Sequence, residues 1–292
     1  MTAAERRRLP SWKDFSELTK PRLVSLVLMS TAAGFFLADG NETQGAQAFL
    51  NALAATGLVA AGSMALNQWL EWEHDAKMPR TSRRPIPAGK ISPRQALGAG
   101  LALSAAGLIY LAWAANVLAV FLAAATLLSY LFLYTPLKRR TSLNTIAGAI
   151  PGALPPMIGW AAATGHLHYG AWVLFSILFL WQIPHFLAIA WLYRREYYDA
   201  GFVMLSGDGT DAPRVARQAV IFSAMLLPVS LMPTLCGMSG ILYFFSALIL
   251  GFALLAVSIS GLRDLDSKAR LLLRASIFYL SVLLLIMVVD KP

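Results

Sequence analysis

The sequence has little cysteine and, for its length, few charged residues. Its 292 residues include one cysteine, Cys236, so a disulfide within the chain and a cysteine-based metal site are both excluded. Charged residues make up 13% of the chain and hydrophobic residues 58%. Soluble proteins usually carry about a quarter charged residues. The composition is therefore typical of a membrane protein.

The long apolar runs also lack the alternation of apolar and polar residues that marks a transmembrane β-strand. Only helices and closed barrels satisfy the backbone's hydrogen bonds in lipid, so the fold class is all-α. We expect one membrane-embedded domain over 1–292, a polytopic bundle of about nine transmembrane helices. Runs long enough to span lie at 23–38, 46–70, 94–113, 116–135, 142–163, 170–192, 215–235, 239–262 and 271–289.

The fifth of these runs contains both glycines and prolines. Gly148 and Gly152 allow a close approach of neighbouring helices, and Pro151, Pro155 and Pro156 disturb the helical hydrogen bonds. We therefore expect this span to be kinked and tightly packed.

Lysine and arginine are confined to alternate loops. Segments 1–22, 71–94, 136–141, 193–217 and 263–274 hold 23 of the 24, and the remaining one, Lys291, follows the last run. Because positive loops mark the cytoplasmic side, we expect the N-terminus in the cytoplasm. Residues 1–22 lack the apolar core of a signal peptide and are expected to be a polar cytoplasmic segment. This distribution explains the net charge of +9 without a nucleic-acid partner.

One polar row interrupts this pattern where the second run ends. Asn67, Glu71 and Asp75 are spaced by four and share one face of a helix, and Arg80 and Arg84 follow. Oxygen donors beside cations suit a divalent metal that carries a phosphorylated substrate. The alternative is an ordinary helix end with a solvated positive loop, which leaves the acidic row unexplained.

Four stretches resemble motifs of the intramembrane (UbiA-type) prenyltransferase superfamily, in their order and spacing. The amino-acid sequences of these stretches are similar to those of the protoheme IX farnesyltransferases, also called heme O synthases. The match covers about residues 15–215, and the last three spans agree in hydropathy alone. The stretches are the row from Asn67 to Arg84, YTPLKRR at 134–140, GAIPGALPPMIGW at 148–160, and WQIPHF at 181–186 followed by Glu196.

The resemblance implies an activity. A farnesyl group would pass from farnesyl diphosphate to a vinyl group of heme b, with Mg²⁺ as cofactor and addition of water, giving heme O. The enzyme would lie in the bacterial cytoplasmic (inner) membrane with its site facing the cytoplasm. It would serve heme synthesis for terminal oxidases, so heme A synthase or an oxidase is an expected partner besides the lipid bilayer.

The same resemblance assigns roles to residues of this chain. The catalytic and metal-binding set is Asn67, Glu71, Asp75 and Glu196, and His185 is a further catalytic candidate. The expected diphosphate-binding residues are Arg80, Arg84, Lys138 and Arg139. Asp199 does not coincide with an acidic position of the heme branch.

Several alternatives stay open at this point. His185 could bind a heme propionate, ligate iron, act on the acceptor, or be a hydrogen-bonded packing residue. Aromatic residues such as Tyr134 and Tyr197 could stabilise a carbocation or belong to the interfacial aromatic belt. The chain could also prenylate an aromatic acid or quinone precursor. A transporter would place its polar site nearer the bilayer midplane, and a non-catalytic assembly factor would need no metal row.

Overall fold

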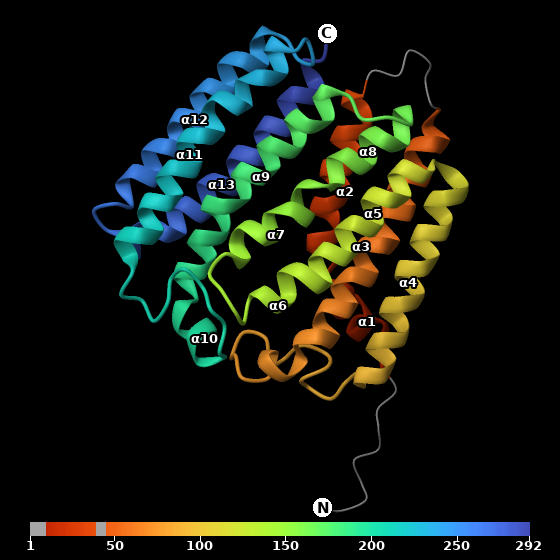
Figure 1. The fold of residues 1–292 in the computed structure, drawn as a ribbon, viewed down its shortest axis with the longest axis vertical. Coiled ribbons are helices and arrows are strands. Elements are labelled where there is room, and N and C mark those ends of the chain that lie inside the picture. Colours follow the sequence, from red (N-terminus) through yellow and green to blue (C-terminus); the bar gives the residue numbers. More distant parts are fainter. Residues whose placement is uncertain (1–9, 39–44) are drawn as a thin grey trace, which may run out of the picture.

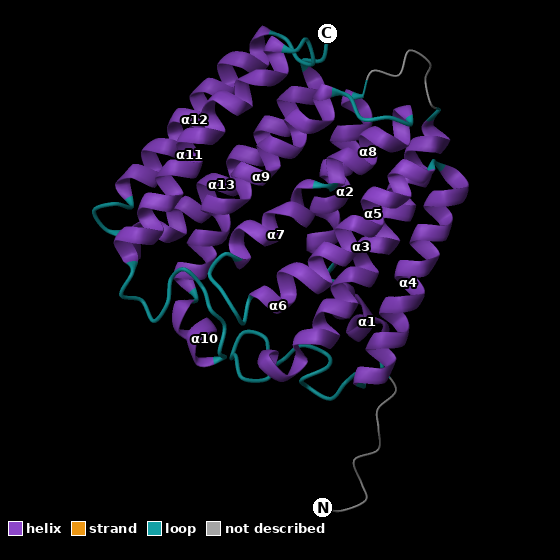
Figure 2. Cartoon of the chain, in the orientation of Figure 1, coloured by secondary structure: helices purple, strands orange, loops and turns teal. Residues whose placement is uncertain are grey.

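The computed structural model describes residues 10–38 and 45–292, and these residues form helices and loops without a β-strand (Figures 1 and 2). The predicted all-α class is confirmed. Residues 1–9 of the predicted N-terminal segment and residues 39–44 of the first predicted outer loop lie outside the described part. The helices are α1 (Trp12–Thr19), α2 (Pro21–Leu37), α3 (Ala46–Asp75), α4 (Pro93–Ala114), α5 (Val117–Leu128), η1 (Ser129–Tyr134), α6 (Thr135–Leu137), α7 (Asn144–Ala153), α8 (Pro155–Thr164), α9 (Tyr169–Leu192), α10 (Arg194–Asp199), α11 (Ala212–Leu235), α12 (Ile241–Ser260) and α13 (Leu265–Val289).

Eight helical stretches of the described chain are long and apolar enough to cross a membrane. Helix α2 has 17 residues and meets α1 at a bend of 50°, at Lys20. Counting this bent pair as one broken span gives nine. The predicted bundle of about nine spans is therefore confirmed, with its first span formed by the pair. The other eight are 46–75, 93–114, 117–137, 144–164, 169–192, 212–235, 241–260 and 265–289.

The segments that end the second and fourth spans gather with α10 at one end of the bundle, whereas the stretch 148–160 runs along α7 and α8. In Figure 1, α1, α10 and the loop after α3 lie at the lower end, whereas α13 ends at the upper end. Because nine is an odd number of spans, the described chain begins and finishes at opposite ends of the bundle. The described parts of the positively charged segments thus share the end at which α3 finishes.

Helix α3 continues to Asp75, five residues beyond the end of the predicted span. Small residues let it pack closely against α4, since a side chain at Gly62 would meet the backbone of α4 at Gly100 and Ser104. The polar row therefore stands on one uninterrupted helix. This places its members one above another on a face that the neighbouring helices cover.

The fourth span changes its helical pitch just before the motif at 134–140. Residues Ser129–Tyr134 form a π-helix, η1, between α5 and α6. The Thr135 hydroxyl donates to the carbonyl of Tyr130, five residues back, at 2.9 Å. Pro136 follows and has no N–H to continue the α-helical ladder. Short π segments are frequent at functional sites.

The fifth span is interrupted by a bend at Leu154, between α7 and α8, as its prolines predict. Its glycines are contact points. A Cβ atom at Gly159 would collide with the backbone carbonyl of Thr31 on α2, and one at Gly152 would meet the side chain of Gln182 on α9. The predicted close packing is confirmed.

Substituting Gly159 with alanine is expected to destabilise the protein by about 1–3 kcal/mol, because the new methyl group meets backbone that cannot rotate away. The matched control is Gly98→Ala, on α4, where a Cβ meets nothing within 4 Å. Its effect is neutral or stabilising by up to about 1 kcal/mol, from helix propensity. Thermal unfolding in detergent compares the two, and equal midpoints would contradict the close contact.

Candidate active site

The polar row of α3 is buried at the lower end of the bundle. Asn67 is 1% exposed, and Glu71 and Asp75 are 3% exposed. The Asn67 amide donates to Glu71 Oε2 at 3.1 Å and to Thr135 Oγ1 at 3.3 Å. Charges are rarely buried to this degree without partners. The partners are therefore informative.

Glu71 is paired with Lys138, the residue that follows α6. Lys138 Nζ lies 2.9 Å from Glu71 Oε1 and 4.5 Å from the centre of the Tyr134 ring. Burial alone would lower the pKa of Lys138, but attraction to the Glu71 carboxylate outweighs it and raises the pKa above its ordinary value. Lys138 therefore keeps its positive charge in the folded protein.

Asp75 is paired with Arg84 from the loop that follows α3. Arg84 Nη1 lies 2.6 Å from Asp75 Oδ2, and the Thr81 hydroxyl donates to the Asp75 carbonyl at 2.8 Å. The loop thus folds back over the end of α3. The predicted metal ligand and the predicted diphosphate-binding arginine are brought into direct contact.

Arg80 is exposed and is held by the segment that leads into α10. Its guanidinium lies 4.9 Å from the centre of the Tyr193 ring, and Nη2 donates to Tyr197 Oη at 3.3 Å. Stacking on aromatic rings limits the conformations of this long side chain. Arg80 is thereby fixed above the site rather than free in solvent.

Three loops meet around a small apolar cluster next to the site. Met78 is buried against Ala200 and Phe202. The Val203 N–H donates to the carbonyl of Lys138 at 2.7 Å, and the Val203 carbonyl accepts from Asn144 Nδ2 at 2.7 Å. The segment 200–204 therefore ties the loop after α3 to the loop after α6.

Glu196, on α10, has an unusual carboxylate. Its Oε2 atom is buried, yet it makes no hydrogen bond within the described chain. No hydrogen bond or ion pair between described residues links it to the row on α3. An unpaired buried carboxylate oxygen is costly, and it is a feature that a bound cation would compensate. Asp199, at the end of α10, is exposed.

The donor set can be tested against a metal. The described residues contain no group of three or more acidic, histidine or cysteine side chains close enough to hold an ion. Glu71 and Asp75 nevertheless supply hard oxygen donors, and Glu196 supplies a buried, unpaired one. Magnesium commonly takes one or two protein carboxylates, with water and phosphate oxygens completing its shell. The residues fit an ion shared with a diphosphate better than one caged by protein.

Lys20 belongs to this cluster, although sequence reasoning did not single it out. It occupies the bend between α1 and α2 at φ 51°, and its Nζ donates to Asn67 Oδ1 at 3.2 Å. The signal that could have found it is a lysine directly before Pro21, which begins a transmembrane helix.

Two predicted site residues point elsewhere. Arg139 is exposed and donates to the carbonyl of Leu70 on α3 at 3.2 Å. His185 lies at the contact of α9 with α13, where Nδ1 is 2.9 Å from Ser276 Oγ. The Trp181 ring is stacked on the imidazole at 4.9 Å. These two contacts explain how His185 packs between the helices. A role of His185 in the reaction with the acceptor stays a prediction.

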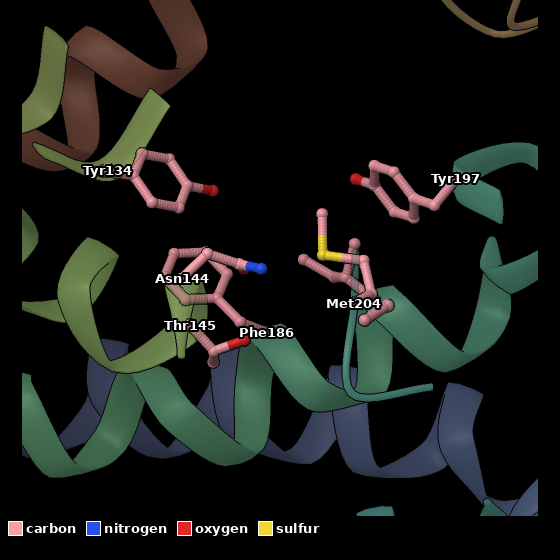
Figure 3. A pocket seen from close by; sticks show the side chains of 8 residues that line it. Tyr134, Asn144, Thr145, Phe186, Tyr197 and Met204 are labelled. Atoms are coloured by element: carbon pink, nitrogen blue, oxygen red, sulfur yellow. The ribbon is translucent and has the colours of Figure 1, made fainter. Parts of the chain in front are cut away.

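A small pocket lies between Tyr134, whose ring Lys138 contacts, and Tyr197, whose hydroxyl accepts from Arg80 (Figure 3). Its volume is about 40 Å³. The Tyr134 and Tyr197 hydroxyl groups point toward one another across it. The full lining is Tyr134, Asn144, Thr145, Phe186, Ile189, Ala190, Tyr197 and Met204.

Known proteins resemble this chain in sequence. The model of the UbiA prenyltransferase family matches residues 27–283. A protoheme IX farnesyltransferase of Solibacter usitatus is 47% identical, over 96% of this chain and 99% of that protein. The protoheme IX farnesyltransferase of Koribacter versatilis is 41% identical, over 96% and 93%.

Solved structures share the fold. A structure of a digeranylgeranylglyceryl phosphate synthase has a TM-score of 0.80 at 16% identity, covering 96% of this chain and 98% of that one. A UbiA homologue from Archaeoglobus fulgidus bound to GPP and Mg²⁺ has a TM-score of 0.67 at 14% identity, covering 94% and 99%. With the match to the family model, the long apolar helices and the buried acidic row, the chain belongs to the UbiA prenyltransferase family and is an integral membrane prenyltransferase.

Proposed function

We propose that the enzyme transfers a farnesyl group from farnesyl diphosphate to a vinyl group of heme b, with addition of water, giving heme O and diphosphate. The observation that carries this is the pairing of Glu71 with Lys138 and of Asp75 with Arg84 at one end of the bundle. The near full-length similarity to protoheme IX farnesyltransferases supports heme b as the acceptor. In this proposal residues 1–292 act as one prenyltransferase domain.

Asn67, Glu71, Asp75 and Glu196 are the proposed ligands of Mg²⁺. The ion, when bound, stabilises the negative charge that develops on the leaving diphosphate. The Archaeoglobus fulgidus homologue bound to GPP and Mg²⁺ supports this choice of metal. The buried, unpaired Oε2 of Glu196 supports it independently.

The cations of the site have a second role in the proposal. Lys138, Arg84, Arg80 and Arg139 bind the diphosphate, the arginines through paired N–H groups. In the structure Lys138 and Arg84 are held in place by the acidic row. They are therefore positioned before the substrate arrives, and their charge is available where the carbon–oxygen bond breaks.

The apolar helices supply the remaining requirement, which is a dry environment for the farnesyl cation. His185 is the proposed residue on the acceptor side. Its hydrogen bond to Ser276 and its stacking on Trp181 fix the ring and leave the second ring nitrogen to act.

The distribution of lysine and arginine supports a cytoplasmic orientation of the site. We propose that the enzyme lies in the bacterial cytoplasmic (inner) membrane, with the lower end of Figure 1 facing the cytoplasm. Heme O serves terminal oxidases, so heme A synthase or an oxidase is the proposed recipient of the product.

A direct assay tests the function. Membranes that contain the protein are incubated with heme b, farnesyl diphosphate and Mg²⁺, and the hemes are analysed by mass. We expect a farnesylated, hydrated heme that is absent when Mg²⁺ is chelated. No farnesylated heme, together with prenylation of a hydroxybenzoate-type acceptor, would instead assign the chain to the enzymes of aromatic acids and quinone precursors.

A further inference from the structure

The pocket between η1, α7, α9 and α10 is too small for either substrate. Ligand pockets usually measure about 300–1,000 Å³, whereas a water molecule needs about 10–15 Å³ of accessible cavity volume. A volume of about 40 Å³ accommodates a few water molecules. Its size therefore fits water rather than a substrate.

Water also needs polar partners, and the pocket has them. The hydroxyl groups of Tyr134 and Tyr197 point into the space from opposite sides (Figure 3), and Thr145 brings a third hydroxyl to the lining. The NH2 group of Asn144 is already occupied, because it donates to the carbonyls of Thr141 and Val203, both at 2.7 Å. The hydroxyl groups are left to hold water, which typically makes about three hydrogen bonds in a buried site.

Each tyrosine also contacts a predicted diphosphate-binding cation. Lys138 Nζ lies 4.5 Å from the centre of the Tyr134 ring. Arg80 Nη2 donates to Tyr197 Oη at 3.3 Å, so the Tyr197 hydroxyl uses a lone pair there and keeps its hydrogen for another partner. The pocket is thus adjacent to the position at which the diphosphate would leave.

We propose that Tyr134 and Tyr197 hold the water molecule that the reaction adds to the acceptor. The inference rests on the proposed function, because only a reaction that adds water requires such a site. It makes the tyrosines positioning residues, separate from the metal and diphosphate ligands.

The step balances without a further reactant. The carbon–carbon π pair of the vinyl group forms a bond to C1 of the farnesyl group, and the C1–oxygen pair leaves with the diphosphate. The cation that remains on the vinyl carbon next to the macrocycle accepts a lone pair from the held water. One proton of that water passes to a diphosphate oxygen. Without a held water, the same cation loses a proton and forms an alkene.

The test measures the ratio of the hydrated product to the alkene product rather than the rate of turnover. Tyr134→Phe and Tyr197→Phe keep the rings beside Lys138 and Arg80 but remove the hydroxyl groups. Tyr198→Phe is the control, since Tyr198 is the next residue on α10, is exposed and does not line the pocket. Each variant is incubated with heme b, farnesyl diphosphate, Mg²⁺ and heavy-oxygen water, and the porphyrins are resolved by mass.

We expect the ratio of hydrated to dehydrated product to fall about three- to tenfold in each pocket variant, the effect of losing one hydrogen bond. The control keeps the wild-type ratio. An unchanged ratio in both pocket variants overturns the water site, even if turnover falls, because a purely structural loss lowers both products together. Failure of the proposed function is recognised separately, as no farnesylated porphyrin from the wild-type protein.

Discussion

Replacing Asp75 with asparagine is expected to abolish measurable turnover, a loss of about a thousandfold or more, while leaving a folded protein. Asparagine has the same shape and can still accept the hydrogen bond that Arg84 donates to Asp75 at 2.6 Å. It lacks the negative charge with which Asp75 attracts a divalent cation, and the proposed site has few carboxylates to replace it. Removing one group that stabilises developing charge in a buried site costs about 10²–10³ in rate, and loss of the ion costs more.

The measurement is turnover with Mg²⁺ and farnesyl diphosphate, accompanied by a thermal unfolding curve. Glu73→Gln is the control, because Glu73 is an exposed carboxylate two residues earlier on the same helix. Both variants lose one negative charge at nearly the same place. Wild-type activity in Asp75→Asn would remove Asp75 from the metal site, and equal loss in Glu73→Gln would point to a general charge effect.

Replacing Lys138 with methionine is expected to cost about 3–5 kcal/mol of stability and at least a hundredfold in turnover. The carboxylate of Glu71, which is 3% exposed, would lose its ion-pair partner at 2.9 Å. Removing one member of a buried ion pair is strongly destabilising, because it leaves an uncompensated charge, whereas replacing both members is often close to neutral. The loss of turnover follows from the missing cation beside the leaving diphosphate.

The double variant Lys138→Met/Glu71→Gln separates these two effects. We expect it to regain stability to within about 1 kcal/mol of the wild type and to remain inactive. Arg140→Met, an exposed cation two residues from Lys138, should change neither property. If the single and double variants unfold at the same temperature, Glu71 does not depend on Lys138 for its burial.

The spans could be predicted because lipid imposes a requirement on every stretch of the chain separately. A helix in a membrane must satisfy its own backbone and present apolar residues over about 20 positions, so hydropathy locates it. The break at Leu154 was foreseeable for a similar reason, since Pro155 and Pro156 act locally. The π-helix Ser129–Tyr134 could not be predicted in this way, because the hydrogen bond that Thr135 donates to Tyr130 depends on how Thr135 is packed.

In the candidate site, too, local features could be predicted from the sequence and long-range contacts could not. The spacing of Asn67, Glu71 and Asp75 is a local property, and it correctly placed them on one face of a helix. That this face is buried follows from the packing of the other helices. The contact of Lys20 with Asn67 joins residues 47 positions apart and leaves no periodic signal. Arg80 and Tyr197 are 117 positions apart. Contacts of this kind follow from the packing of complete helices, which a single sequence does not display.

The hydrogen bond from the Val203 N–H to the Lys138 carbonyl has a consequence for the order in which the enzyme assembles. The ribosome delivers residues 71 and 138 to the membrane well before it delivers residue 203. The early segments can form their ion pair, but the covering segment 200–204 arrives only after the sixth span has been inserted. A partly synthesised chain therefore carries the cations of the site without the tyrosines of α10. Competence to react is therefore acquired only after the segment that follows the sixth span has been synthesised.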